Sequence, residues 1–212
     1  MECNAEQYRH DAQYDENRRS ILTLGWQQFV KVQEETNTSL TLEFLVNGPE
    51  RENGVVFIRK NKISVTAEII NMMYWVQDFT DAEEQLLVEE RAGMNRARFS
   101  HVLGYPGYHI HDNHIMLRKE LNWIAKAWNI FLSAHCLPTK NMARVEYYRL
   151  RYIYAIRQGY NVDLGKMIIN SLDNITQAYF AGGVGLCGII THICQMNRIA
   201  DHPTDVYMPC GR

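Results

Sequence analysis

The pattern that most constrains the fold is a series of apolar stripes with helical spacing in the second half of the chain. The first stripe stops before Leu137-Pro138 and consists of Leu117, Leu121, Ile124, Trp128 and Phe131. Three more stripes follow: Val145, Tyr148, Tyr152 and Ile156, then Leu164, Ile168 and Leu172, then Ile189, Ile190 and Ile193. Residues three or four positions apart share one face of a helix, so each stripe predicts a helix with one buried face.

The large side chains of these helices are the predicted core. Burial of apolar surface stabilises a fold by roughly 25 cal/mol per Å², and aromatic residues at helical spacing are usually core residues. We expect six side chains to be largely buried: Trp128, Phe131, Leu150, Ile153, Ile168 and Ile193.

A small β-hairpin is predicted in the first half. Val55–Ile58 and residues 63–65 are rich in β-branched residues, and they flank the polar pair Lys60-Asn61. Such runs around a tight polar turn favour a hairpin, and asparagine tolerates the positive φ that hairpin turns need. Thr66 then stands where its hydroxyl can cap a following helix.

The predicted fold class is therefore mainly α, a helical domain with one small β-hairpin near residues 55–65. The chain has 212 residues, a length that suits one domain. We interpret residues 1–20 as a polar lead-in, 21–200 as a single mainly helical domain, and 201–212 as a tail. Within the domain, the helix and hairpin part is 21–110 and the helical part is 111–200.

Composition and charge exclude several classes of protein. Hydrophobic residues make up 46% and charged residues 22%, which is typical of a globular domain and not of a disordered chain. The net charge of −2 gives no global attraction to nucleic acid or to an anionic membrane. No apolar run approaches the roughly 18 residues that span a bilayer, and the polar start is unlike a signal peptide. The five cysteines form no C-x-x-C pair, so we expect reduced thiols and an intracellular location, nuclear or cytoplasmic.

Several segments, taken in order, resemble a known family. In the second half they are Trp128-x-x-Phe131, Leu137-Pro138-Thr139, Arg149-Leu150-x-Tyr152-Ile153-Tyr154-Ala155-Ile156, Gly159, Asn161-Val162-Asp163-Leu164-Gly165, and Leu186-Cys187-x-Ile189-Ile190-Thr191-x-Ile193-Cys194. In the first half they are Leu42-x-Phe44, Ile58-Arg59 and Ile69-Ile70-Asn71. This ordered set, from about Trp26 to about Ile199, resembles the plant transposon protein domain family. One departure is Lys60, where that family usually has glycine in an Arg-Gly-Lys turn.

The resemblance implies a plant retroelement or a gene domesticated from one. It implies no agreed activity, and it carries over no set of catalytic residues. The chemistry of the chain has to be argued from its own residues.

One candidate site is a metal centre formed by His109, His111 and His114. Imidazoles bind Zn²⁺ or another borderline metal. The run from His109 to His114 is close to the H-x-H-x-D-H signature of metallo-β-lactamase-type hydrolases, but Asn113 stands where that signature has Asp. The alternative is a polar loop in which Asp112 or Asn113 caps a helix.

A glycine motif offers a second candidate. Gly183-Val184-Gly185-Leu186-Cys187-Gly188 spells G-x-G-x-x-G before a predicted helix, and Asp205 lies further on. A dinucleotide site needs a preceding strand and a βαβ unit around the motif. The short segment before it and the few residues after it cannot supply these, so a flexible turn between helices is the preferred interpretation.

A third candidate is a basic surface between residues 112 and 166, where basic residues outnumber acidic ones and tyrosines are interleaved. Arginine and tyrosine together can hold phosphates and stack on bases. The predicted contact residues are Arg118, Lys119, Arg144, Arg151 and Arg157. The alternative is an ordinary solvated helix surface.

The acidic segment at 78–90 has six carboxylates and no basic residue. It predicts a solvated segment, or a patch that docks on basic helices within the chain or between copies. The predicted function is therefore a non-catalytic interaction module of a plant transposon-derived protein, associated with nucleic acid or self-associating as a homo-oligomer. The rival is a metal-dependent hydrolase built on His109, His111 and His114. We expect no cofactor and no membrane partner.

Overall fold

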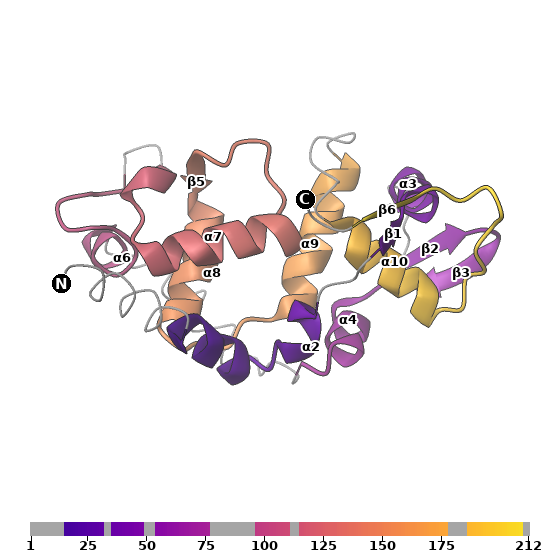
Figure 1. Cartoon of the computed structure of the whole chain (residues 1–212), viewed down its shortest axis with the longest axis horizontal. Helices are drawn as coiled ribbons and strands as arrows, with labels where there is room; N and C mark the ends of the chain where they lie inside the picture. Colours follow the sequence, from indigo (N-terminus) through magenta and orange to yellow (C-terminus); the bar gives the residue numbers. More distant parts are fainter. Residues whose placement is uncertain are drawn as a thin grey trace, which may run out of the picture. The chain divides into compact units, whose positions relative to one another are not determined.

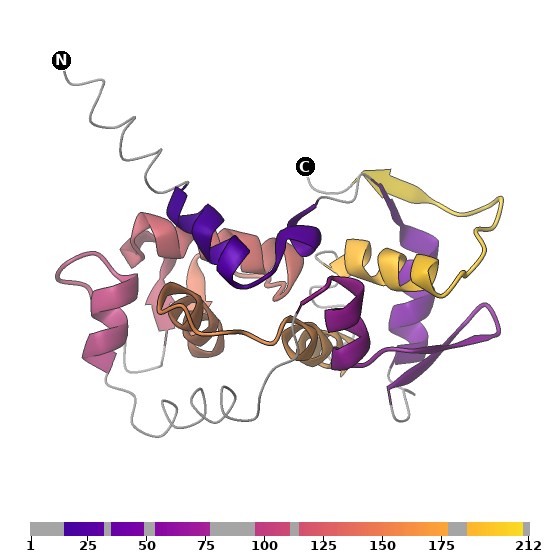
Figure 2. The same cartoon turned by 90° about the horizontal axis from the view of Figure 1, so that it is seen from below.

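The computed structural model describes residues 15–31, 35–48, 54–76, 96–110, 115–177 and 186–209. This part of the chain is mainly helical, and its strands form only two-stranded antiparallel sheets (Figures 1 and 2), so the predicted fold class is confirmed. None of the helices in these ranges is both long and apolar enough to cross a membrane.

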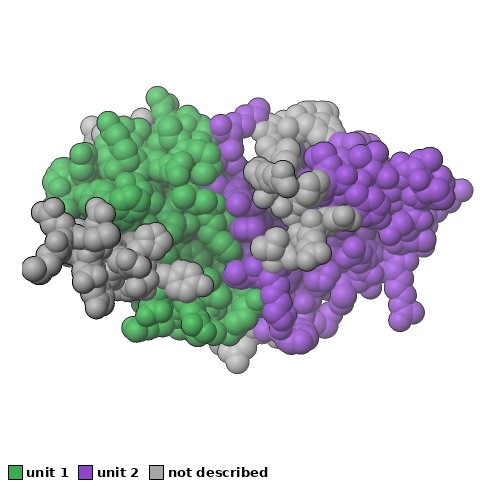
Figure 3. Space-filling view, in the orientation of Figure 1, with its two compact units in different colours: residues 1–27, 77–131, 141–162 green, residues 28–76, 132–140, 163–212 purple. Residues whose placement is uncertain are grey.

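The chain divides into two compact units, and each is assembled from segments that are far apart in the sequence (Figure 3). Unit 1 comprises residues 1–27, 77–131 and 141–162. Unit 2 comprises residues 28–76, 132–140 and 163–212. The domain boundaries expected from the sequence stay a prediction.

Unit 1 combines helices with one short sheet. Residues 15–23 are helical. The next elements are α6 (Arg96–Leu103), β4 (Ile115–Leu117), the 3-10 helix η2 (Arg118–Glu120) and α7 (Trp123–His135), which belongs to this unit up to Phe131. Strand β5 (Arg144–Glu146) runs directly into α8 (Tyr147–Arg157). Strands β4 and β5 are antiparallel, and Met116 and Val145 face each other in the buried centre of the sheet.

Aromatic rings fill much of the core of unit 1. The ring centroids of Trp26 and Trp128 are 6.2 Å apart in an edge-on arrangement, and Phe99 stacks on Tyr154 at 4.0 Å. Such pairs contribute about 0.5–1.5 kcal/mol beyond the area that they bury. Rings from segments that are far apart in the sequence are thus packed together in unit 1.

The predicted core is confirmed at five of its six positions, since Trp128, Leu150, Ile153, Ile168 and Ile193 are all buried. Phe131 is a correction, because it is only half-buried. Its ring lies against those of Trp26 and Trp128, while Trp128 and Leu132 of the same helix are more deeply buried.

Unit 2 contains the remaining elements. They are α2 (Gln27–Val30, in this unit from residue 28), β1 (Glu35–Asn37), α3 (Thr38–Asn47), β2 (Val55–Ile58), β3 (Asn61–Ser64), α4 (Ala67–Met73), α9 (Leu164–Gln177), α10 (Cys187–Met196) and β6 (Tyr207–Pro209). Helix α3 packs against α10 and β2. Helix α4 begins where the sequence predicts, since the Ile69 N–H donates to the Thr66 hydroxyl at 3.4 Å.

The predicted hairpin is formed by β2 and β3, but its turn lies one residue earlier than expected. Ile58 pairs with Asn61, so Arg59 and Lys60 are the two turn residues. Their φ values of 48° and 66° are those of a type I′ turn. Asn61 is the first residue of β3, and its side-chain amide donates to the Arg59 carbonyl at 3.0 Å. Asn61 therefore stabilises the turn through its side-chain hydrogen bond, and the residues with positive φ are Arg59 and Lys60.

A polar clamp joins α4 to the start of α9, which lie side by side in both views (Figures 1 and 2). The Asn71 side chain donates to Asp163 at 2.9 Å and accepts from the Gly165 N–H at 2.7 Å. A Cβ at Gly165 would overlap the carbonyl oxygen of Ala67, so the approach of the two helices requires glycine. Segments 69–71 and 161–165, which carry part of the family resemblance, thus meet in one contact.

Two strand pairs were not predicted. Strand β1 pairs with β6, and β4 pairs with β5. Each strand has three residues, too few for a visible alternation, and each partner is distant in the sequence. Residues 201–209, predicted as part of a tail, lead into and form β6.

Candidate nucleic-acid interface

Three of the five predicted basic contact residues lie together in unit 1. Leu117 of β4 pairs with Arg144 of β5, and the Arg118 N–H donates to the Ala143 carbonyl at 2.9 Å. Arg118 and Lys119 of η2 therefore lie beside Arg144 at one end of this sheet. Lys119 and Arg144 are exposed and Arg118 is half-buried. We call these three residues the basic edge.

A buried glutamate fixes the backbone of the basic edge. Glu120 is 5% exposed, and its carboxylate accepts from the Leu117 N–H at 2.8 Å. The bond closes the η2 turn around Arg118 and Lys119. The local sequence thus turns the chain tightly, so that two successive basic residues emerge from one short, hydrogen-bonded segment.

The other two predicted residues lie along α8, beyond the basic edge. Arg151 is half-buried on that helix. The Arg157 guanidinium forms an ion pair with Glu16, and its side chain is 18% exposed. A guanidinium already paired with a carboxylate is less available to a phosphate, so Arg157 serves the packing of unit 1.

An aromatic and cationic cluster that the sequence analysis did not single out lies close to the basic edge. Lys126 Nζ is 4.8 Å from the ring centroid of Tyr105 and 5.0 Å from that of Trp123. Both distances are within the range of cation–π attraction. The helical spacing of Trp123 and Lys126 could have indicated their contact, but the approach of Tyr105 is a tertiary event. We call these three residues the Trp–Lys–Tyr cluster.

The predicted metal site falls largely outside the described residues. His109 is exposed, and His111 and His114 lie in the undescribed segment 111–114. Within the described ranges, no group of three or more His, Cys, Asp or Glu side chains is arranged to hold a metal ion. The metal-dependent hydrolase therefore stays a hypothesis.

The glycine motif is also only partly described. Gly183 to Gly185 lie outside the described residues, whereas Cys187 and Gly188 begin α10. Asp205, noted in the sequence as a distant acidic partner of the motif, has another role. It forms an ion pair with Arg59 and accepts from the Asn37 side chain at 2.8 Å.

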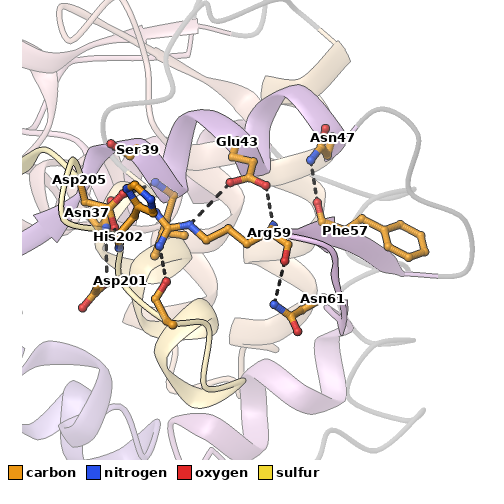
Figure 4. A network of polar contacts seen from close by, with 12 residues as sticks. Asn37, Ser39, Glu43, Asn47, Phe57, Arg59, Asn61, Asp201, His202 and Asp205 are labelled. Atoms are coloured by element: carbon orange, nitrogen blue, oxygen red, sulfur yellow. Dashed lines mark hydrogen bonds and ion pairs between the residues drawn. The ribbon is translucent and has the colours of Figure 1, made fainter.

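The Arg59–Asp205 pair belongs to a polar network in unit 2 (Figure 4). Figure 4 shows the Arg59 side chain reaching from the hairpin toward Asp205 and Asn37, while Glu43 of α3 accepts from the Arg59 N–H at 2.6 Å. Burial acts to raise the pKa of Asp205, but hydrogen bonds from the His202 N–H, Asn37 and Arg59 and the charge of Arg59 outweigh it and lower the pKa to about 2. The network attaches the C-terminal residues to the hairpin and to α3, which is a structural role.

A second group of titratable side chains in unit 2 is buried at Tyr74 and Cys136 and half-buried at His135 and His192. The Tyr74 hydroxyl is 3.3 Å from His192 Nδ1, and burial lowers the pKa of His192 and of His135. Burial also raises the pKa of the Cys136 thiol well above its ordinary range. A thiol that stays protonated is a poor nucleophile, so Cys136 is a core residue despite its neighbour His135.

The comparisons with known proteins identify a family. The model of the family described as "Putative plant retrotransposon-related domain" matches residues 22–200. No curated protein and no solved structure matches the chain. The match covers most of the sequence and spans elements of both units. The chain therefore belongs to the plant retrotransposon-related domain family.

Proposed function

We propose that the chain is a non-catalytic module of a retrotransposon-derived protein, and that it contacts nucleic acid through the basic edge of unit 1. The observation that carries this proposal is the β4–β5 pairing, which gathers Arg118, Lys119 and Arg144 at one end of a sheet. Cationic side chains held close together neutralise adjacent phosphates and release their counterions.

The attraction is local, because the whole chain has a net charge of −2. Glu146, exposed at the far end of β5, opposes it. At physiological salt, charges more than about 8 Å apart are largely screened from each other. A short cluster of cations can thus bind a phosphate backbone on a chain of near-neutral total charge.

The test is a titration of labelled oligonucleotides at about 50 and 200 mM salt. We expect affinity to fall with salt, with a slope of roughly 0.7–0.9 for each phosphate contacted. The combined variant Arg118→Ala, Lys119→Ala and Arg144→Ala should weaken binding. It should also reduce the salt slope by the amount that about two to three phosphate contacts contribute.

The control replaces one exposed cation of the other unit. Lys62 is exposed on the hairpin of unit 2, and Lys62→Ala should leave binding and its salt slope unchanged. Circular dichroism verifies that the variants are folded. Absence of binding at 50 mM salt, or equal losses in the triple variant and the control, would reject the proposal.

Two further outcomes separate the rival functions. Stoichiometric zinc in the tag-free protein, lost in His111→Ala, would establish the hydrolase hypothesis instead. A dimer by light scattering, together with no oligonucleotide binding, would favour self-association. We also propose an intracellular location, nuclear or cytoplasmic, in keeping with a nucleic-acid partner and with the buried free thiols of Cys136 and Cys194.

A further inference from the structure

The Trp–Lys–Tyr cluster combines features that a purely structural contact would not require. Trp123 is 62% exposed, whereas Trp26 and Trp128 of the same unit are buried. Lys126 lies near both the Trp123 and the Tyr105 rings. The surface of unit 1 therefore presents an accessible indole with a cation and a second aromatic ring beside it.

Hydrogen bonds of the Asn122 side chain fix the start of α7, which carries Trp123 and Lys126. The Asn122 side chain accepts from the Ala125 N–H at 3.0 Å and donates to the Val102 carbonyl at 2.8 Å. The first bond caps the start of α7, and the second attaches this start to the end of α6. Trp123 and Lys126 thus project from a fixed first turn of α7.

Tyr105 is placed by a turn of its own. The Tyr108 N–H donates to the Tyr105 carbonyl at 3.2 Å, and Gly107 between them has φ of 89°. Pro106 followed by a glycine of positive φ is the signature of a type II turn. The ring of Tyr105 is therefore presented by a defined loop.

Glu120 connects the cluster to the basic edge. Its backbone carbonyl accepts from the Tyr105 N–H at 2.9 Å, while its carboxylate closes the η2 turn that carries Arg118 and Lys119. The neighbouring residues Gly104 and Leu121 form an antiparallel bridge. The loop that carries Tyr105 is thus hydrogen-bonded to the segment that carries Arg118, Lys119 and Trp123.

We propose that the Trp–Lys–Tyr cluster binds unpaired bases of single-stranded nucleic acid by stacking, with the adjacent phosphates on the basic edge. This inference rests on the proposed function and deepens it. In a duplex the faces of the bases are stacked on one another, whereas a single strand offers each π-face to an aromatic side chain. The selected ligand is therefore a single strand, with little dependence on base sequence.

The experiment compares a single strand with the duplex of the same sequence, as DNA and as RNA, at one salt concentration. We expect the protein to prefer the single strand. Trp123→Ala should weaken single-strand binding about 5- to 150-fold, the range expected for loss of one stacked base, and should leave duplex binding and the salt slope unchanged. Trp123→Phe, which keeps a ring, should retain much of the affinity.

Tryptophan fluorescence gives a readout of contact. Stacking on a base should quench the emission of Trp123, so the quenching seen with the parent protein should disappear in Trp123→Phe. The control is Trp75, a 75% exposed tryptophan of unit 2, because Trp75→Phe should preserve the quenching.

The outcomes keep the two proposals apart. Loss of all binding in the basic-edge variant, with no effect of Trp123→Ala and no preference for the single strand, would overturn the stacking inference and leave the proposed function standing. No binding of any oligonucleotide would reject both. Single-strand preference that persists in Trp123→Ala and Tyr105→Ala would place the stacking surface elsewhere.

Discussion

At the scale of single residues, Lys60 occupies a backbone conformation that suits glycine. Its φ of 66° lies in the left-handed region, which costs a residue with a side chain roughly 1–2 kcal/mol. Glycine avoids this cost but loses about 0.5–1 kcal/mol through its greater freedom in the unfolded chain. The family resemblance includes glycine at this position, and the type I′ turn explains that preference.

We therefore expect Lys60→Gly to raise the free energy of unfolding by about 0.5–1 kcal/mol. Lys62→Gly is the matched control, because Lys62 lies within strand β3. There the glycine should lower stability by a similar amount. Chemical denaturation of the two variants measures both changes, and a destabilised Lys60→Gly protein would show that the turn is formed differently.

Gly165 is constrained by space and not by its φ. A side chain there would collide with the backbone of Ala67, which cannot move without shifting α4. Gly165→Ala should cost about 3 kcal/mol or more, the upper range for overpacking. Gly25→Ala is the comparison, because nothing lies within 4 Å of its Cβ position and only the cost of its positive φ, about 1–2 kcal/mol, applies. Equal losses in the two variants, measured by denaturation, would contradict the close approach of α4 and α9.

At the scale of elements, the contact between the end of α4 and α10 involves a titratable pair, Tyr74 and His192. The Tyr74 ring also packs edge-on against Phe29 of α2, with centroids 5.0 Å apart. Burial favours the neutral imidazole and so lowers the pKa of His192 from its ordinary value of 6.5. Protonation of this histidine therefore opposes folding.

The sign of the pH dependence follows from linkage. The unfolded chain binds the proton more readily, so the contribution of His192 to stability is present above pH 6.5 and is lost as the pH falls below it. We expect a lower Tm at pH 5 than at pH 7.5, and a smaller difference in His192→Gln. His101→Gln, a change at an exposed histidine of α6, should leave the difference unchanged. A Tm difference that is the same in His192→Gln and in the parent would exclude this histidine as its source.

At the scale of the whole molecule, the order of segments along the chain does not follow the order in space. Each compact unit takes residues from both halves of the sequence. In unit 2 the pairing of β1 with β6 joins residues 35–37 to residues 207–209, and the Arg59–Asp205 ion pair reinforces this closure. Contacts between segments that are far apart in the sequence therefore hold this unit together, whereas the division into parts 21–110 and 111–200 stays a prediction.

The sequence by itself determined the helical character of the fold, five of six named core residues, the hairpin and the cap at Thr66. These features depend on local periodicity and on the conformational preferences of neighbouring residues, which a linear pattern contains. It also placed the chain in its family, through motifs such as Asn161 to Gly165.

Only the tertiary structure decided which polar residues act together. Arg118 and Arg144 lie beside each other because two three-residue strands pair, although α7 separates them in the sequence. Tyr105 lies near Lys126 because its N–H donates to the carbonyl of Glu120. Arg157, equally basic in the sequence, is bound to Glu16 instead. The charge of a residue is a property of the sequence, but its neighbours are set by packing between distant segments, and these neighbours decide whether the charge is available to a ligand.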